Sequence, residues 1–391
     1  MTPKPSSCSG CPLETNGFDF IANEGSGASG LCIVGEAPGD AEGRDHLPFR
    51  PYSPAGAVLE RTITKAGQSR QAQSLTNITR CRPSAAGFLE HAPFEHAAIQ
   101  HCQTHLAATM AEYKPKAILA LGNIPLRSLT GFTGKKQSIS HVRGFYLDGI
   151  GAAHGIPVIG SIHPAFIARG KSNMLGVLRA DFLRALHLAQ SGGKFTRPVK
   201  DYTCFPPIDV AQRWLDAARL VPGEMISYDI ETAESLQGVD ESELRTLEDG
   251  RLEWAPLKPE FQEMPEHLVQ VEAEEMVAKV EVTRTRITQI QFSIRPLEAI
   301  ILPFEGDYIR VAREILALPN PKIGHNCWNF DNPLLEGAGL PIAGRNDDSM
   351  WIFHHLQADL PKGLQFVTSF YIPEAEPWKH LNDADPGRYG G

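Results

Sequence analysis

The first half of the chain is organised around the stretch Leu31-Cys-Ile-Val-Gly-Glu-Ala-Pro-Gly-Asp-Ala-Glu42. Its first four residues are apolar and predict a buried β-strand. The glycine and proline residues that follow predict a tight turn from this strand into a helix. In open α/β sheets such turns lie at the carboxyl ends of the strands, where ligands bind. The stretch therefore predicts an α/β fold with a site at this turn.

Short apolar runs alternate with amphipathic helices from Leu31 to about Gln190. This alternation is typical of a domain built on a mainly parallel sheet. We predict three further strands, at 75–79, 117–121 and 158–162. Asn77 lies within the first of them, and His163 directly follows the last. Because the carboxyl ends of parallel strands meet at one edge, we expect both residues to lie near Glu36.

Charge divides the chain into two parts. Residues 1–200 carry 21 Lys and Arg against 13 Asp and Glu, whereas residues 201–391 carry 16 against 33. A net charge of +8 in the first part suits a phosphate backbone. The −17 of the second part fits metal-ligand carboxylates or a solvated acidic surface. The Gly- and Pro-bearing stretch 191–200 coincides with the change, so we predict a domain at 1–190, a linker, and a second domain at 201–391.

The seven cysteines are spread thinly over 391 residues, which is unlike the framework of a small secreted disulfide protein. Four of them fall in or beside the motifs of the first half: Cys8, Cys11, Cys81 and Cys102. Four thiolates hold either zinc or a [4Fe–4S] cluster, and their spacing alone does not decide between the two. No run approaches the roughly 20 apolar residues of a membrane span, so we expect no membrane partner.

The motifs of the first half, taken together, resemble the family 4 uracil-DNA glycosylases over residues 5–190. They are Cys8-x-x-Cys11, Gly35-Glu-Ala-Pro-Gly-x-x-Glu42, Pro48-Phe49, Pro54-Ala-Gly56, Thr76-Asn77, Arg80-Cys-Arg-Pro83, Cys102, Ala120-Leu-Gly122, Val142-Arg-Gly144 and His163-Pro-Ala165. The resemblance implies an αβα sandwich with a central parallel sheet. It also implies hydrolysis of the N-glycosidic bond of uracil, or a related deaminated or modified pyrimidine, in single- or double-stranded DNA, and a structural [4Fe–4S] cluster on the four cysteines.

The same resemblance implies how the base is recognised. A base must be flipped out of the duplex, stacked on one face and read along its Watson–Crick edge. Phe49 is the implied stacking residue, and Asn77 is the amide that pairs with uracil N3–H and O4. His163 is the implied donor to uracil O2, where it stabilises the leaving anion. The segment Arg50-Pro-Tyr-Ser53 lengthens the usual step between Pro-Phe and Ala-Gly, which changes the wall of the pocket.

Glu36 and Glu42 are the acidic candidates for positioning water or stabilising the cationic sugar. Ala37 stands where the best-known uracil glycosylases carry a catalytic aspartate, so the catalytic carboxylate is the open assignment. Three basic residues on nearby loops are candidate phosphate contacts, with solvated surface as the alternative reading: Arg143, Arg169 and Lys171.

In the second half, Asp229 and Glu231 lie two apart on a predicted strand, so their carboxylates point to the same face. Further on, Gly324-His-Asn-Cys-Trp-Asn-Phe-Asp331 opens a predicted helix. Together these motifs resemble the first two motifs of the DEDD-type 3′-to-5′ exonucleases. The resemblance implies an RNase H-like α/β domain with a mixed sheet, and two Mg²⁺ or Mn²⁺ ions held by Asp229, Glu231 and Asp331.

The third exonuclease motif is expected where the sequence ends. Tyr389 fits its tyrosine, and no aspartate follows at the family's spacing. We therefore expect the front part of a longer phage or bacterial replication or repair protein, with a DNA polymerase as partner in cis or in trans. The expected location is the cytoplasm of a bacterium or phage-infected cell, and the expected state is a monomer. The Glu-rich stretch 233–281 is predicted to be an insertion, either partner-binding or solvated.

The leading hypothesis is a DNA-repair glycosylase fused to a metal-dependent exonuclease module. The alternative is an exonuclease or proofreading protein whose glycosylase-like domain only binds or senses DNA. A third reading, a scaffold with two decayed sites, is disfavoured by the intact motifs of the first half.

Overall fold

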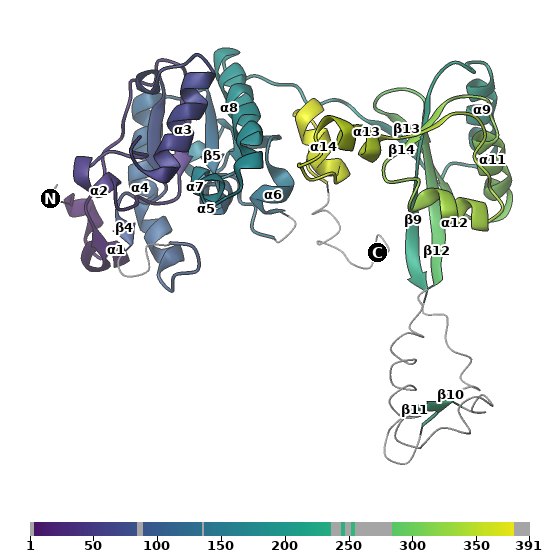
Figure 1. The fold of residues 1–391 in the computed structure, drawn as a ribbon, viewed down its shortest axis with the longest axis horizontal. Helices are drawn as coiled ribbons and strands as arrows, with labels where there is room; N and C mark the ends of the chain where they lie inside the picture. Colours follow the sequence, from purple (N-terminus) through teal and green to yellow (C-terminus); the bar gives the residue numbers. More distant parts are fainter. Residues whose placement is uncertain are drawn as a thin grey trace. The chain divides into compact units, whose positions relative to one another are not determined.

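The computed structural model describes residues 4–83, 89–134, 137–235, 244–246, 252–254 and 284–378. The chain forms two compact units (Figure 1). The first unit takes in the chain up to Val199 and, in addition, the segment that begins at Met350. The second unit spans Lys200–Ser349. The sequence prediction placed the whole of 201–391 in the second domain, so the segment from Met350 is a difference from that prediction.

The first unit is built on a five-stranded sheet with the order β3-β2-β5-β7-β6. Four of its strands are parallel and β6 is antiparallel to β7. The strand bounds are Leu31–Gly35 for β2, Ser74–Asn77 for β3, Ala117–Leu121 for β5, Tyr146–Asp148 for β6 and Pro157–Ser161 for β7. The sheet is therefore mainly parallel, as the alternation of apolar runs and helices predicts.

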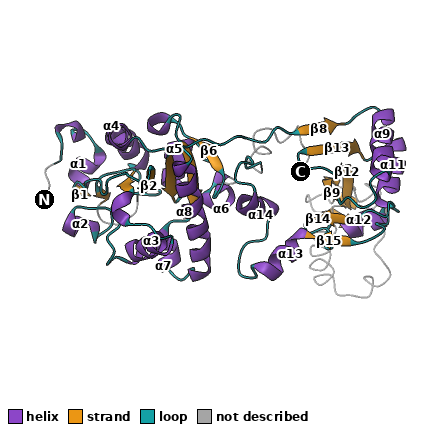
Figure 2. Cartoon of the chain, turned by 90° about the horizontal axis from the view of Figure 1, so that it is seen from above, coloured by secondary structure: helices purple, strands orange, loops and turns teal. Residues whose placement is uncertain are grey.

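Alternate side chains of each central strand feed two separate cores. Leu31 and Ile33 of β2 face a core with α3, α7 and α8, whereas Cys32 and Val34 face one with α4 and α5. Figure 2 shows α4 on one side of the sheet and α3 and α7 on the other. The helix bounds are Pro54–Lys65 for α3, Glu95–Tyr113 for α4, Asn123–Thr130 for α5, Pro164–Ala168 for α7 and Leu175–Gln190 for α8. The unit is thus a three-layer α/β/α sandwich.

Short elements complete this unit around the sheet edge. The strands β1 and β4 pair antiparallel with each other. Their bounds and those of the other short elements are Ser6–Cys8 for η1, Pro12–Asn16 for α1, Gly17–Phe18 for β1, Glu42–Asp45 for α2, Arg70–Ala72 for η2, Arg82–Pro83 for β4, Ile139–Val142 for α6, Gly151–Ala153 for η4 and Ser172–Met174 for η5.

The segment from Met350 belongs to the first unit because its apolar side chains complete that unit's core. It forms α13 (Ser349–Leu356) and α14 (Leu364–Tyr371). Phe353, Leu360 and Phe366 are buried in the same core as α3 and α8. Burying large apolar side chains in this way is the dominant favourable contribution to folding.

The second unit has a six-stranded mixed sheet with the order β15-β14-β9-β12-β13-β8. The strands β9, β12 and β13 are antiparallel neighbours, whereas β14 and β15 run parallel to β9. The bounds are Asp201–Cys204 for β8, Ile208–Arg219 for α9, Ile226–Ser235 for β9, Arg284–Ser293 for β12, Glu298–Pro303 for β13, Gly306–Leu316 for α11, Lys322–Gly324 for β14, Asp331–Gly337 for α12 and Asn346–Asp348 for β15.

The predicted insertion at 233–281 lies mostly outside the described residues. Within it, β9 continues to Ser235, and a short antiparallel pair is described, β10 (Leu244–Thr246) with β11 (Leu252–Trp254). Among the helices of the described ranges, none combines the length and the apolar character that a bilayer crossing requires.

Candidate active site

The carboxyl ends of the parallel strands bring the predicted residues to one edge of the first sheet. Gly35 at the end of β2 is in register with Asn77 at the end of β3. Leu121 at the end of β5 is in register with Ser161 at the end of β7. Glu36 directly follows β2, and His163 lies two residues after β7, so this edge carries a carboxylate, an amide and an imidazole.

Gly35 is the point where the Asn77 amide meets the Phe49 ring. A Cβ at Gly35 would lie 2.3 Å from Asn77 Oδ1 and 2.4 Å from Phe49 Cζ, so both side chains rest on its bare backbone. Asn77 is buried, and its amide makes no hydrogen bond to any described residue. A buried amide without a protein partner is costly unless a ligand completes it. The pair thus presents a flat ring beside an unused donor and acceptor.

Phe49 is held in a strained conformation. Its φ is 47°, in the left-handed region that bulky side chains avoid, and its ring is buried. Two contacts hold the loop around Phe49: the Arg70 guanidinium donates to the Pro48 carbonyl, and α3 packs tightly on the loop at Gly56. Such strain is characteristic of functional sites. The Phe49 ring also faces the His163 ring, with 6.3 Å between their centroids.

The His163 side chain has a defined tautomer. Its Nδ1 accepts a hydrogen bond from the backbone N–H of Ala165 at 3.1 Å, so the proton of the neutral ring is on Nε2. Desolvation, with a contribution from the positive charge of Arg169, lowers the pKa of His163 to about 4. At neutral pH His163 is therefore an uncharged hydrogen-bond donor.

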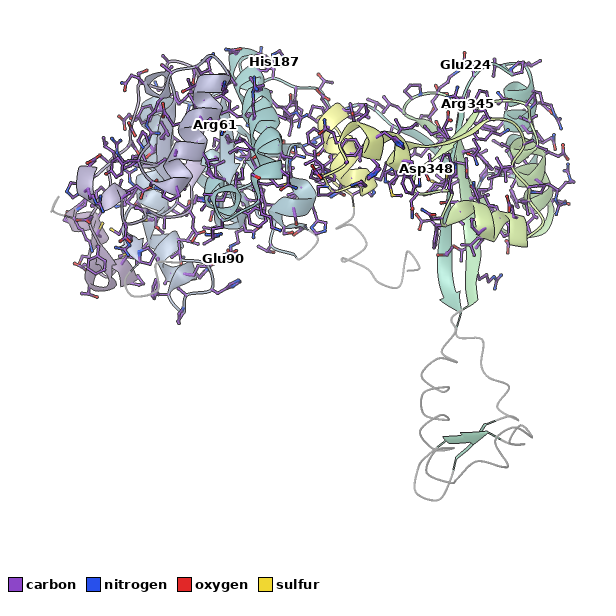
Figure 3. All side chains as sticks on the ribbon, in the orientation of Figure 1. Arg61, Glu90, His187, Glu224, Arg345 and Asp348 are labelled. Carbon is purple, nitrogen blue, oxygen red and sulfur yellow. The ribbon has the colours of Figure 1, made fainter. Side chains whose placement is uncertain are left out.

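Glu36 and Glu42 both hold backbone amides of neighbouring turns. Glu36 Oε1 accepts from the N–H groups of Leu89 and Glu90, at 3.1 and 3.3 Å. Burial raises the pKa of Glu36, and the nearby carboxylate of Glu90, labelled in Figure 3, acts in the same direction. Glu42 is buried and its Oε2 accepts from the N–H of Gly39 at 3.0 Å. Each carboxylate keeps one oxygen outside these bonds.

The three candidate phosphate contacts differ in exposure. Arg169 and Lys171 are exposed at the end of α7, the helix that begins after His163. Arg143 is buried, with its side chain 1% exposed. Its Nε donates to Asp181 Oδ2 at 2.9 Å, so the structure corrects the expectation that Arg143 meets a phosphate.

Asp181 is a site-supporting residue that the sequence did not single out. It is fully buried on α8, pairs with Arg143, and accepts a hydrogen bond from the Ser161 hydroxyl at 2.7 Å. It thereby fixes the end of β7, two residues before His163. The one sequence signal is an aspartate within an apolar helix, which indicates a buried partner of unknown position.

The four predicted cluster cysteines lie together in the fold. Cys8 and Cys11 flank the turn between η1 and α1, Cys81 follows the Asn77 loop, and Cys102 is on α4; all four are buried free thiols. Burial and the neighbouring thiols raise the pKa of Cys81 to about 12 and of Cys102 to about 11. The four thiols therefore influence one another electrostatically.

Two cations flank these thiols, which makes the donor set suitable for a negatively charged group. Lys4 Nζ donates to the carbonyls of Leu13, Glu14 and Gly17, and its charge opposes the raised pKa of the Cys81 thiol. The buried Arg80 guanidinium interacts with Cys81 and Cys102. In the described ranges, no three His, Cys, Asp or Glu side chains are close enough to share a single ion. A cluster holds its thiolates farther apart than one ion does, because its iron atoms stand between them.

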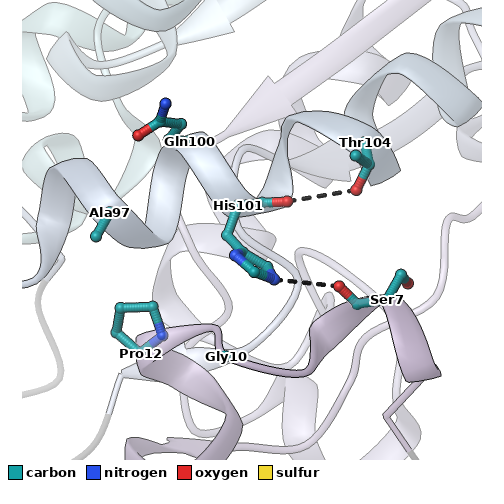
Figure 4. Close-up of a pocket in the computed structure, with 7 residues that line it drawn as sticks. All are labelled: Ser7, Gly10, Pro12, Ala97, Gln100, His101 and Thr104. Carbon is teal, nitrogen blue, oxygen red and sulfur yellow. Dashed lines mark hydrogen bonds between the residues drawn. The ribbon is translucent and has the colours of Figure 1, made fainter.

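A pocket of about 570 Å³ lies on this cysteine side of the unit (Figure 4). His101 reaches across it from α4, with Nε2 at 3.1 Å from the Ser7 carbonyl oxygen. Its other lining residues are Gly10, Pro12, Ala97, Gln100 and Thr104. The pocket therefore borders the Cys8–Cys11 turn rather than the base-recognition edge.

In the second unit, Asp229 and Glu231 of β9 and Asp331 of α12 influence one another electrostatically. Burial, followed by the charge of Asp331, raises the pKa of Asp229 to about 7. Burial also raises the pKa of Asp331, and the negative charge of Glu231 adds to this increase. Asp229 Oδ2 accepts from Gln291 Nε2 at 2.6 Å, and Asp331 Oδ1 accepts from the backbone N–H of Ile230 at 3.0 Å. The three carboxylates thus share one neighbourhood.

Asp348, labelled in Figure 3, is a further carboxylate that acts on Asp331, and the sequence prediction missed it. It is buried at the end of β15 and accepts from the N–H groups of Asn326 and Trp328, at 2.9 and 3.2 Å. Its charge contributes to the raised pKa of Asp331. It therefore holds the loop that leads into α12.

The comparisons with known proteins place the first unit in a family. The model of the uracil DNA glycosylase superfamily matches residues 22–187. A type-4 uracil-DNA glycosylase of Thermotoga maritima is 33% identical over 168 residues, which are 43% of this chain and 81% of the relative. One of Pyrobaculum aerophilum is 28% identical over 196 residues, which are 49% of this chain and 94% of the relative. One of Saccharolobus solfataricus is 31% identical over 165 residues, which are 40% of this chain and 71% of the relative. The chain belongs to the type-4 uracil-DNA glycosylases.

Proposed function

We propose that the first unit is a monofunctional uracil-DNA glycosylase, which flips a uracil out of DNA and hydrolyses its N-glycosidic bond. One observation carries the proposal: the Asn77 amide and the Phe49 ring rest side by side on Gly35, and His163 faces the same ring. A flipped base needs a stacking surface and polar groups along its edge, and these three side chains supply both.

Asn77 selects the base. Its amide N–H donates to uracil O4 while its carbonyl oxygen accepts from N3–H, whereas cytosine presents the reverse pattern at these two positions. Binding cytosine leaves the buried amide unpaired, which costs about 1–3 kcal/mol, or about 5- to 150-fold in discrimination.

His163 stabilises the leaving base. Cleavage of the N-glycosidic bond leaves negative charge on the uracil, and the Nε2–H donor of His163 is positioned to bond to O2. Because the pKa of His163 is lowered to about 4, it acts as a neutral donor rather than a general acid at neutral pH. Uracil therefore leaves as an anion.

Glu36 and Glu42 supply the carboxylate chemistry for the sugar. Each has one oxygen fixed by backbone amides and one outside those bonds, which suits a carboxylate that orients water or balances the cationic sugar. Glu36→Gln and Glu42→Gln, compared in single-turnover excision, assign the role. The variant with the larger loss identifies the catalytic carboxylate, and two near-normal rates would exclude both.

Cys8, Cys11, Cys81 and Cys102 are the residues that would hold a [4Fe–4S] cluster. When bound, the cluster supplies a covalent staple between the N-terminal turn, the Asn77 loop and α4. Purified protein should be brown and contain four irons per chain, and Cys81→Ala should lose both the colour and thermal stability. A colourless protein that contains one zinc would mean that the four cysteines hold zinc and not a cluster.

The glycosylase proposal is tested with uracil-containing single- and double-stranded oligonucleotides, followed by alkaline cleavage of abasic sites. We expect cleavage with uracil, and Asn77→Asp should relax the discrimination against cytosine. Intact oligonucleotides with uracil, hypoxanthine and 5-modified uracils would leave DNA binding or sensing as the function of the first unit. Unchanged base selectivity of Asn77→Asp would remove its assigned role.

For the second unit, a metal-dependent 3′-to-5′ exonuclease is the candidate function. The electrostatic coupling of Asp229, Glu231 and Asp331 favours it, and a mixed sheet with β14 and β15 parallel to β9 supports the RNase H-like expectation. With Mn²⁺, the chain should shorten a 5′-labelled single strand from its 3′ end, and EDTA or Asp229→Asn should stop the reaction. Asp209→Asn, at an exposed position in the first turn of α9, is the matched control. If the Asp229→Asn variant still shortened the strand, the activity would come from a contaminating nuclease.

A further inference from the structure

We propose that Tyr52 is a DNA-stacking residue at the rim of the pocket. Its ring holds a nucleobase that neighbours the flipped uracil, and Arg44 meets an adjoining phosphate. This inference rests on the proposed glycosylase function and adds a substrate contact outside the base-recognition pocket. Tyr52 lies in Arg50-Pro-Tyr-Ser53, the segment that lengthens the step between Phe49 and α3.

The Tyr52 ring is exposed but fixed. It is 53% exposed, and its hydroxyl donates to the Ala41 carbonyl oxygen at 2.9 Å. That bond joins the turn that carries Glu42 to the segment that begins with Phe49. Because both of these residues belong to the candidate site, the hydrogen bond places the Tyr52 hydroxyl beside that site. An exposed aromatic ring suits stacking by any base.

Arg44 carries a charge that no acidic side chain of the described residues neutralises. Its guanidinium carbon lies 6.0 Å from the Tyr52 ring centroid, its side chain is exposed, and it forms no ion pair with any described residue. Arg50 lies at the same distance from the ring but pairs with Asp45 at 2.8 Å and with Glu24 at 3.4 Å. Arg44 is therefore available to a phosphate, whereas Arg50 holds the loop.

Several contacts fix the loop in advance of binding. Arg70 forms a two-pronged pair with Glu24, with nitrogen–oxygen distances of 2.9 and 2.6 Å, and Glu24 in turn pairs with Arg50. The Ser53 hydroxyl accepts from the N–H of Gly56 at 3.0 Å, which ties the loop to the start of α3. A contact residue that is already ordered loses little entropy when DNA binds.

The first experiment measures binding and turnover of Tyr52→Ala and Tyr52→Phe. Fluorescence anisotropy gives the Kd for a labelled uracil-free single strand, and excision assays give KM and kcat. Tyr52→Ala should raise Kd and KM about 10-fold with kcat retained, whereas Tyr52→Phe should stay within about twofold of the parent. Tyr202→Ala, a similarly exposed tyrosine of the second unit, is the control.

The second experiment finds the base that is stacked. Uracil substrates carry an abasic spacer on the 5′ or the 3′ side of the uracil, and the ratio of KM values between Tyr52→Ala and the parent is compared. This KM ratio should fall to about one with the spacer that removes the stacked base and stay raised with the other spacer. An unchanged KM in Tyr52→Ala, or an equal ratio with both spacers, overturns the inference while parental excision still supports the glycosylase. Tyr52-dependent binding without excision would instead overturn the proposed function.

Discussion

At the scale of single residues, the candidate active site depends on the missing side chain of Gly35. Its bare backbone lets the Asn77 amide and the strained Phe49 ring approach each other, because a Cβ would overlap both. A displacement of about 1 Å in a reacting group can cost about 100-fold in rate.

Gly35→Ala should therefore lower kcat/KM for uracil excision about 100-fold and destabilise the unit by about 1–3 kcal/mol through overpacking. Single-turnover excision and urea unfolding measure the two effects. Gly176→Ala is the matched control, since a Cβ there meets no atom within 4 Å. Parental excision by Gly35→Ala would show that the amide and ring do not need this close approach.

The lowered pKa of His163 predicts an unusual pH profile. The unfolded chain binds a proton to this histidine below about pH 6.5, whereas the folded protein does so only near pH 4. The unfolded state thus holds more protons between these values, so stability should fall as pH decreases from about 6.5 to about 4 and level off below. Excision should show no inflection near pH 6.5.

His163→Gln is the variant that checks this assignment. It should lower kcat about 100- to 1000-fold, as the loss of one oxyanion donor does. It should also remove the part of the stability decrease between pH 6.5 and 4 that His163 causes. A parental kcat/KM that drops through pH 6.5 would mean that His163 is charged in the working pH range.

At the scale of elements, α14 covers a buried ion pair of the first unit. The Arg143 guanidinium lies 5.1 Å from the Phe366 ring centroid and 4.6 Å from that of Phe370, and donates to Ser369 Oγ at 2.9 Å. Gln365 Nε2 donates to the His141 carbonyl at 2.7 Å. The helix therefore seals Arg143 and its partner Asp181 from water.

Arg143→Met should destabilise the first unit by about 3–5 kcal/mol, because it leaves the Asp181 carboxylate buried without its main partner. Arg184, at 3.8 Å from Asp181, offsets part of that loss. Urea unfolding measures the change, and exposed Arg61→Met (Figure 3) should stay within about 0.5 kcal/mol. Near-parental stability of Arg143→Met would argue that α14 does not seal the pair.

The sequence predicts well those features that depend on local pattern. The apolar runs that become β2, β5 and β7 fix which residues follow a strand end, and so Glu36 and His163 could be placed at one sheet edge. Contacts between distant segments could not be predicted in this way. Arg143 resembles an exposed loop residue in sequence because its partners lie far along the chain, on α8 and α14.

At the scale of the whole molecule, the two halves of the sequence carry opposite net charges, +8 in residues 1–200 and −17 in residues 201–391. DNA binding by the basic half should weaken steeply with salt, because bound phosphates release counterions. Arg169 and Lys171 are the exposed candidates for these contacts.

Replacing both Arg169 and Lys171 by Ala should reduce the slope of log K against log salt concentration by about 1.4 for a single strand. Anisotropy titrations over a range of salt concentrations measure the slope. Arg213→Ala, on α9 of the second unit, should leave it unchanged. An unaltered slope in the double variant would place the phosphate contacts elsewhere.

The return of the chain to the first unit at Met350 has a consequence for its synthesis. At about 5–20 residues per second, a ribosome needs roughly 8–30 s to pass from Val199 to Met350. During that time the nascent first unit lacks Phe353, Phe366 and the helix that covers Arg143. The described part of the second unit is fully translated at Ser349, before that of the first. Translation thus completes the described parts of the two units in the reverse of the order in which it begins them.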